Sequence, residues 1–135
     1  MSDPLHAFVR ACGYRHGDLF IRLAIPLARR GYRVTGIDLS PLFVRKAAMR
    51  AEEAGVKARF VEGDIQDVEA LFATEGPFDA FINMFTSHGY YGRQGDLSLF
   101  RQLRHLAAPG AAMVLLTSHL DWLVRNFAPQ GMDRA

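Results

Sequence analysis

Strand-like and helix-like segments alternate along this 135-residue chain from about residue 22 onward. Strands are predicted at residues 32–38, 58–64, 76–85 and 111–118, and the segments between them carry apolar residues at helical spacing. A strand, a helix and a strand repeated in this order require right-handed crossovers, which make the strands parallel and cover both faces of the sheet with helices. The sequence therefore predicts a single three-layer α/β/α domain with a mostly parallel sheet.

Polar and turn-forming residues mark where the predicted helices begin and end. Ser40 is expected to be a helix N-cap, followed by Pro41 in the first turn and by Gly55 as the C-terminal stop. Asp67 and Asp96 are expected to be the N-caps of two further helices. Pro109–Gly110 is expected to form a turn that leads into the last strand.

The beginning of the chain is less regular. Residues 7–12 can supply a first strand, although Arg10 would then stand in the middle of a strand that should be buried on both faces. A helix capped by Asp18 would hold Pro26 well inside it, which costs about 3 kcal/mol. We therefore expect the helix to begin near residues 22–23, where Pro26 falls in the first turn, and residues 14–21 to form a loop.

Composition excludes several classes of protein. The formal net charge is only +2 and no block of like charges forms a stripe, so a nucleic-acid-binding surface is not indicated. Cys12 is the single cysteine, which leaves no intramolecular disulfide, and His105 and His119 lack metal-ligand spacing. Neither a signal peptide nor a membrane-spanning run of apolar residues is found, so we expect a cytoplasmic protein without a membrane partner.

Two carboxylates follow predicted parallel strands, at the edge of the sheet where ligands bind in such folds. Asp38 can accept hydrogen bonds from two ribose hydroxyls, or it can help Ser40 to cap the next helix. Asp64 can accept from the exocyclic amine of adenine, with Ile65 offering its backbone N–H and an apolar side chain to the ring. The alternative for Asp64 is a local turn in which the carboxylate binds a backbone N–H.

Four motifs in this order resemble one family. They are IPLARRGYRVTGIDLS, FVEGDIQDV, PFDAFINMFTSHGYY and LRHLAAPGAAMVLLT, and the similarity extends from Ile25 to about Gly131. The chain resembles the small bacterial class I S-adenosylmethionine (SAM)-dependent methyltransferases. The resemblance implies a Rossmann-like fold, SAM as the cofactor, and methyl transfer to an acceptor that is expected to be a small molecule.

The resemblance also assigns roles to residues. It makes Asp38 the ribose ligand, Leu39 a wall of the adenine pocket, and Asp64 and Ile65 the adenine contacts. The remaining cofactor-binding residues that it implies are Asn83, Met84 and Phe85 near the sulfonium and Gly17 in the glycine loop. It assigns no catalytic acid or base and no metal.

The chain departs from the family pattern at both ends. The family has an acidic residue and three closely spaced glycines after its first strand, whereas Gly13 and Gly17 stand here at a different spacing, and Val9 or Arg10 replaces the acid. The family also continues past its fifth strand with a hairpin, and this chain stops at Ala135. We therefore expect an incomplete methyltransferase fold with an atypical segment 1–21, a family-like segment 22–131 and a central first strand. Loss or replacement of the upstream sequence would explain this pattern.

The sequence is also compatible with two other functions. A nicotinamide-dependent dehydrogenase would share the position of Asp38, but four residues after Tyr90 and Tyr91 stand Gln94 and Gly95 where such enzymes have a lysine. A non-catalytic methyltransferase-like protein could act through its uncovered sheet edges, for example as a homodimer.

Residues beyond the fourth predicted strand could face a substrate. His88, Tyr90 and Tyr91 follow that strand, and His88 is either a base or a solvated loop residue.

Overall fold

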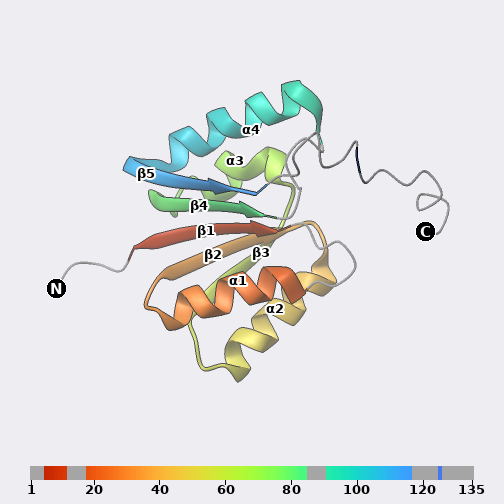
Figure 1. The fold of residues 1–135 in the computed structure, drawn as a ribbon, viewed down its shortest axis with the longest axis vertical. Coiled ribbons are helices and arrows are strands. Elements are labelled where there is room, and N and C mark those ends of the chain that lie inside the picture. The colour runs from red at the N-terminus through yellow and green to blue at the C-terminus, as the bar shows by residue number, and fades with distance from the viewer. Residues whose placement is uncertain (1–4, 12–17, 85–90, 117–124, 126–135) are drawn as a thin grey trace.

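Five parallel strands form one sheet in the order β3-β2-β1-β4-β5 (Figure 1). The computed structural model describes residues 5–11, 18–84, 91–116 and 125. The strands are β1 (His6–Ala11), β2 (Arg33–Asp38), β3 (Ala58–Glu62), β4 (Phe78–Met84) and β5 (Ala107–Leu115). The parallel α/β fold is confirmed, and β1 occupies the predicted central place although it contains Arg10, which is in register with Asn83 of β4.

Helices cover both faces of this sheet, as the alternating pattern predicts. They are α1 (Asp18–Arg29), α2 (Pro41–Glu53), α3 (Val68–Phe72), which follows a short 3-10 turn η1 (Ile65–Asp67), and α4 (Gly92–Leu106). In Figure 1, α1 and α2 lie in front of β2 and β3, whereas α3 and α4 lie on the opposite side and above. Each pair of helices closes its own hydrophobic core.

The core between the sheet and the α3–α4 layer is built around aromatic rings. The ring of Phe8 in β1 meets Phe72 and Phe78 edge-on, at centroid distances of 5.4 and 5.3 Å. Such edge-to-face pairs stabilise a core beyond the area that they bury. The other members of this cluster are Ile37, Ile65, Val68, Phe81, Leu99, Leu103 and Leu106.

The core under α1 and α2 explains why α1 begins earlier than predicted. Ala24 is fully buried against Val34, and Ile21 and Leu27 pack beside it. The apolar residues of α1 in this core form a stripe along the helix, and a helix that starts at Asp18 includes Ile21 in that stripe. Burial of the stripe outweighs the penalty of Pro26, which lies inside the helix on its exposed side. The prediction of a start near residues 22–23 was therefore wrong.

The ends of α2 match the predicted signals. The Ser40 hydroxyl accepts a hydrogen bond from the Phe43 backbone N–H at 3.4 Å, and Pro41 occupies the first turn. Gly55 adopts φ of +66°, the left-handed conformation that ends a helix, and the Val56 N–H bonds back to the Ala51 carbonyl.

Two other boundaries differ from the predictions, and a third is correct in position only. Asp96 lies inside α4, which begins one turn earlier at Gly92. Asp67 stands at the predicted N-cap position of α3, but its side chain makes no cap hydrogen bond. Residues Pro109 and Gly110 lie within β5, where the register against β4 shifts between Phe78 and Ala80. A Pro-Gly pair thus forms an irregularity in a continuous strand instead of a turn before it.

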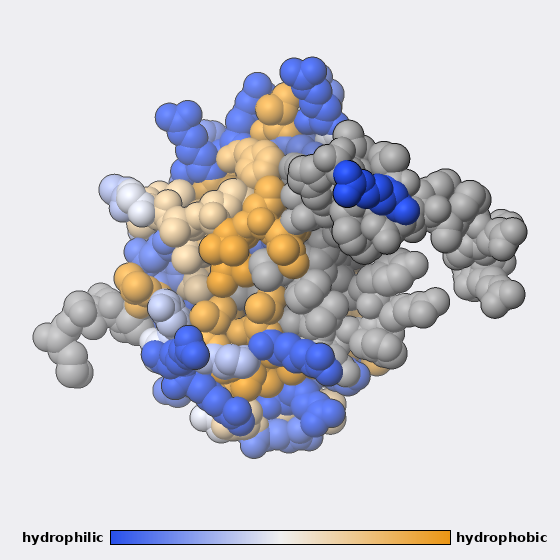
Figure 2. Space-filling model, in the orientation of Figure 1, coloured by the Kyte–Doolittle hydropathy of each residue, from blue (hydrophilic) through white to orange (hydrophobic). Residues whose placement is uncertain are grey.

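The front faces of β4 and β5 carry no helix in the part of the chain that the structure describes (Figure 1). Val114 of β5 is in register with Ile82 of β4, which packs against the core on the α1 side. Val114 and Leu116 are 49% and 45% exposed. Figure 2 shows hydrophobic residues gathered in the middle of this side of the molecule. None of the helices in the described segments is long and apolar enough to cross a membrane.

Candidate functional site

Asp38 and Asp64 lie at the carboxyl ends of neighbouring strands, as the sequence predicts. Asp38 is the last residue of β2 and is in register with Glu62 of β3. The Gly63 N–H donates a hydrogen bond to the Asp38 carbonyl at 3.0 Å, so that Asp64 begins its turn beside the end of β2. The fold therefore brings the two carboxylates to one edge of the sheet.

The Asp38 carboxylate takes part in the local fold. Its Oδ1 atom accepts a hydrogen bond from the Ser40 backbone N–H at 2.7 Å, which fixes the entry to α2. The side chain is half-buried, and Leu39 beside it is 58% exposed. An exposed leucine next to a partly exposed carboxylate provides an apolar and a polar contact at the same strand end, the combination that a nucleoside requires.

The two oxygens of Asp64 have different surroundings. Oδ1 accepts hydrogen bonds from the Gln66 backbone N–H at 2.9 Å and from the Tyr91 hydroxyl at 3.1 Å. Oδ2 has no partner among the described residues. The local turn that was the alternative for Asp64 is thus present, and it uses one oxygen only.

Tyr91 is the residue of this site whose role the sequence did not show. It was predicted to face a substrate, yet its hydroxyl reaches Asp64 from the start of α4, 27 residues away along the chain. Nothing in the local sequence pattern signals a contact between these two positions.

The other predicted cofactor residues lie near the same edge or outside the described part. The Ile65 side chain is buried in the aromatic core, so it anchors the turn after β3 to that core. Asn83 is buried near the end of β4, and its carbonyl accepts a hydrogen bond from the Leu116 N–H at 3.0 Å. Met84 ends β4 in register with Ala11 of β1. Gly17 and Phe85 lie outside the described residues, as do His88, Tyr90 and His119.

Helix α4 holds the turn after β3 through a second set of hydrogen bonds. The Gln102 side-chain amide donates to the Gln66 carbonyl at 2.6 Å, and its oxygen accepts from the Glu69 N–H at 3.1 Å. Gln102 therefore satisfies an N–H in the first turn of α3 that Asp67 leaves uncapped. The Gln66 side chain also approaches the Gly95 carbonyl at 3.5 Å.

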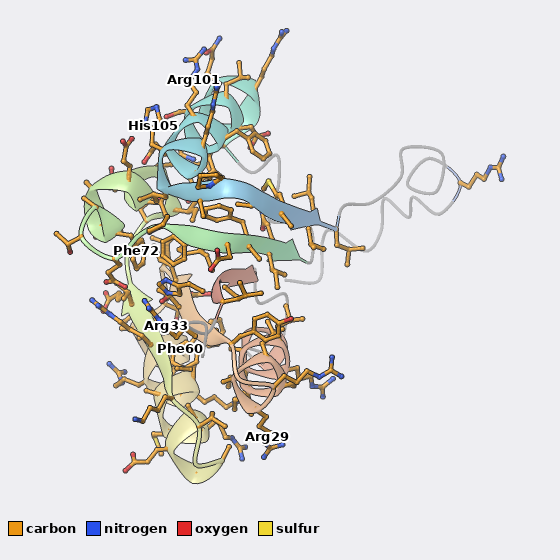
Figure 3. All side chains as sticks on the ribbon, turned by 90° about the vertical axis from the view of Figure 1, so that its left-hand side faces the viewer. Arg29, Arg33, Phe60, Phe72, Arg101 and His105 are labelled. Carbon is orange, nitrogen blue, oxygen red and sulfur yellow. The ribbon has the colours of Figure 1, made fainter. Side chains whose placement is uncertain are left out.

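A groove of about 880 Å³ lies at the opposite end of the sheet, where β1, β2 and β3 begin. Figure 3 looks at this end of the molecule, with Arg33 near its centre. The groove belongs to the amino ends of the strands and is separate from the edge that carries Asp38 and Asp64. Charged residues of both signs line it, namely Arg33, Glu52, Lys57, Arg59 and Glu75.

His6 is the buried polar residue behind this groove. Its Nδ1 atom lies 3.3 Å from an Arg33 nitrogen, and its Nε2 atom lies 2.8 Å from the Thr35 hydroxyl. Burial lowers the pKa of His6 from its ordinary value of 6.5, the Arg33 charge lowers it further, and Asp79 opposes them. Because arginine can only donate, Nδ1 accepts and the neutral ring carries its proton on Nε2.

The described residues bring no three potential metal ligands together. His105 instead pairs with the exposed Glu69 carboxylate at 2.9 Å.

Comparison with known proteins places these features in a family. A sequence profile described as "Methyltransferase domain" matches residues 21–110, which is two thirds of the chain. A ubiquinone biosynthesis O-methyltransferase of Methylobacterium sp. is 44% identical over 62 residues, covering 46% of this chain and 24% of that protein.

Solved structures agree with the fold. The PH0226 protein of Pyrococcus horikoshii superposes with a TM-score of 0.70 at 22% identity, over 91% of this chain and 53% of its own. The glycopeptide N-methyltransferase MtfA, in a complex with SAM, superposes with a TM-score of 0.64 at 19% identity, over 82% of this chain and 43% of its own. This chain thus spans about a quarter of the curated relative's length and about half of each structure's.

Proposed function

The chain belongs to the methyltransferase domain family, and from this premise we propose that it binds SAM at the carboxyl ends of β2, β3 and β4 and transfers the methyl group to a small-molecule acceptor. The observation that carries the proposal is the pair of carboxylates, Asp38 and Asp64, on adjacent strand ends. Open parallel sheets bind their ligands at this edge.

The residues present fit the adenosine half of SAM. Asp38 would accept from the ribose hydroxyls, and Leu39, more than half exposed, would contact the adenine ring. The Oδ2 atom of Asp64, which has no partner among the described residues, would accept from the adenine amine, and the Ile65 backbone N–H would donate to the ring. Asn83 and Met84, at the end of β4, would lie toward the methionine half of the ligand, and the resemblance assigns Phe85 and Gly17 to the same half.

The chemistry requires little of the protein beyond placement. When bound, SAM supplies an electrophilic methyl group on a positively charged sulfur. This chain's residues fix the adenosine and thereby the direction in which that methyl group points. Alignment of donor and acceptor can supply most of the rate enhancement in such a transfer, so no acid or base is assigned.

Calorimetric titration with SAM and with S-adenosylhomocysteine tests the proposal. We expect both to bind, and Asp38→Ala to weaken binding about tenfold or more, because each hydrogen bond to a charged group contributes about 1.5–3 kcal/mol. Glu53→Ala, which removes an exposed carboxylate at the far end of α2, should bind as the unmodified chain does.

A melting curve of each variant separates lost binding from lost structure, because Asp38→Ala also removes the hydrogen bond to the Ser40 N–H. A folded, unmodified chain that binds neither ligand contradicts the proposal.

The exposed apolar surface of β5 favours a second candidate, a methyltransferase-like protein that acts through protein association. On this alternative the chain would not bind SAM and would associate through the edge of its sheet.

A further inference from the structure

The contact between Tyr91 and Asp64 joins two segments that lie 27 residues apart in the sequence. Asp64 belongs to the turn after β3, and Tyr91 directly precedes α4. Their hydrogen bond is 3.1 Å long and partly buried. It reaches the Asp64 oxygen that already accepts from the Gln66 N–H.

This arrangement fixes the orientation of the Asp64 carboxylate. With the backbone N–H alone, the carboxylate could rotate about its Cβ–Cγ bond and exchange its two oxygens. A second donor from another direction makes Oδ1 the oxygen that faces the protein. The other oxygen, Oδ2, accepts no hydrogen bond from the described residues and is the oxygen that the proposal assigns to the ligand.

Gly95 gives an independent indication that this position of Tyr91 is built into the fold. A Cβ atom at Gly95 would lie 2.4 Å from the Tyr91 Cβ and 3.5 Å from its Cγ. Glycine inside a helix costs about 1 kcal/mol relative to alanine, so its presence needs a reason. Here the reason is the close approach of Tyr91, whose Cβ atom occupies the space that a side chain at Gly95 would need.

We propose that Tyr91 is a positioning residue that makes the site selective for a 6-amino purine over a 6-oxo purine. This inference rests on the proposed function, in which Asp64 accepts a hydrogen bond from the adenine amine. An ionised carboxylate can only accept, so a ligand with an oxygen in place of the amine sets two acceptors against each other. The repulsion is largest when the carboxylate cannot turn away, which is the condition that Tyr91 imposes.

Titration with an adenine ligand and its 6-oxo analogue tests the inference. The ligands are S-adenosylhomocysteine and its deaminated analogue, S-inosylhomocysteine. The analogue also carries a proton on N1, but this difference is the same for every variant, so the change in the ratio of the Kd values on Tyr91→Phe isolates the effect of the Asp64 carboxylate. We expect the unmodified chain to prefer the adenine ligand. Tyr91→Phe should narrow the ratio of the two Kd values about three- to tenfold, the range that one hydrogen bond contributes.

Two further variants make the test specific. Gly95→Ala should also narrow the ratio, because the added methyl group would lie 2.4 Å from the Tyr91 Cβ and 3.5 Å from Gln66 Oε1, so that the backbone before α4 must shift and carry the Tyr91 hydroxyl away from Asp64. Tyr32→Phe removes a tyrosine hydroxyl in the other core, beside α1, and should leave the ratio unchanged.

The possible failures are distinguishable. If Tyr91→Phe weakens both ligands by the same factor, or changes neither, Tyr91 does not set selectivity and the inference is overturned while the proposed function stands. If the folded, unmodified chain binds neither ligand, the proposed function fails and the inference fails with it.

Discussion

His6 is held by the fold in its neutral form. Its side chain is buried at 5% exposure, lies against the tilted ring of Phe78 at a centroid distance of 4.2 Å, and has a partner at each ring nitrogen. A protonated ring would need a hydrogen-bond acceptor where Arg33 now donates. The charge would also be buried beside the guanidinium, which explains the lowered pKa of His6.

The lowered pKa of His6 predicts a loss of stability in weak acid. The unfolded chain takes up the proton near pH 6.5 and the folded chain only at lower pH, so the free energy of unfolding should fall as the pH drops below 6.5. Urea unfolding at several pH values between 5 and 8 measures this slope. His6→Gln should flatten it, whereas His105→Gln, at an exposed position on α4, should not. Equal slopes for the unmodified chain and His6→Gln would contradict the prediction.

The residues of the candidate site divide into those that a sequence can indicate and those that it cannot. Asp38 and Asp64 could be located because each follows a run of strand-forming residues, and parallel strands bring their carboxyl ends together. The bond from Tyr91 to Asp64 could not be predicted, since it depends on how α4 crosses the turn after β3. The requirement for glycine at position 95 could not be predicted for the same reason. Tyr91, which excludes a side chain at Gly95, is only four residues away, but its position depends on tertiary contacts.

At the scale of helices, the capping residues and prolines in the sequence predicted the helix ends correctly where tertiary contacts agreed with them, and wrongly where tertiary contacts opposed them. The start of α2 at Ser40 and Pro41 needs no distant contact, and it was predicted correctly. The cap of α3 depends on Gln102 of another helix, and the early start of α4 accompanies the contact that Tyr91 makes. A capping pattern covers only a few consecutive residues, so it includes neither Gln102 for the start of α3 nor Asp64 for the start of α4.

In α1 the burial of apolar residues competes with the cost of Pro26 inside the helix, and a substitution at Pro26 measures that cost. It lacks the N–H that would bond the Arg22 carbonyl, and its ring crowds the preceding turn. Because Pro26 is exposed, Pro26→Ala should remove the penalty without leaving a cavity. We expect the free energy of unfolding to rise by about 1–2 kcal/mol, which is less than the full penalty because proline also restricts the unfolded chain.

Pro41 is the matched control for this change. It stands in the first turn of α2, where its missing N–H costs nothing and its fixed φ suits the helix. Pro41→Ala should therefore leave stability unchanged or lower it slightly. Chemical denaturation of the two variants side by side measures both effects. A loss of stability in Pro26→Ala would mean that the proline shapes α1 in a way that the packing requires.

At the scale of the whole molecule, the sheet is unevenly covered. Strands β3 and β5 are the two edge strands of the described sheet; α2 packs against β3, whereas no described helix covers the front of β5 (Figure 1). No charged residue occurs from Ala107 to Ser118. The exposed apolar residues of this region are Met113, Val114, Leu115 and Leu116. Proteins normally protect an edge strand with charges, proline or covering elements, and an apolar edge without them tends to pair with another chain. In β5 the one proline, Pro109, lies near the start of the strand, and the apolar residues from Met113 onward follow it.

We therefore expect this chain to self-associate through β5 as its concentration rises. Light scattering after gel filtration should give a mass that increases with loading. Val114→Lys should hold the mass at that of one chain, because a lysine at this half-exposed position puts a charge on the surface that would be buried on association. Met49→Lys, on the outer side of α2, is the control for a general gain in solubility, and it should associate as the unmodified chain does. If the mass of the unmodified chain stays constant across concentrations, the exposed edge does not drive association, and the second candidate function loses the observation that favours it.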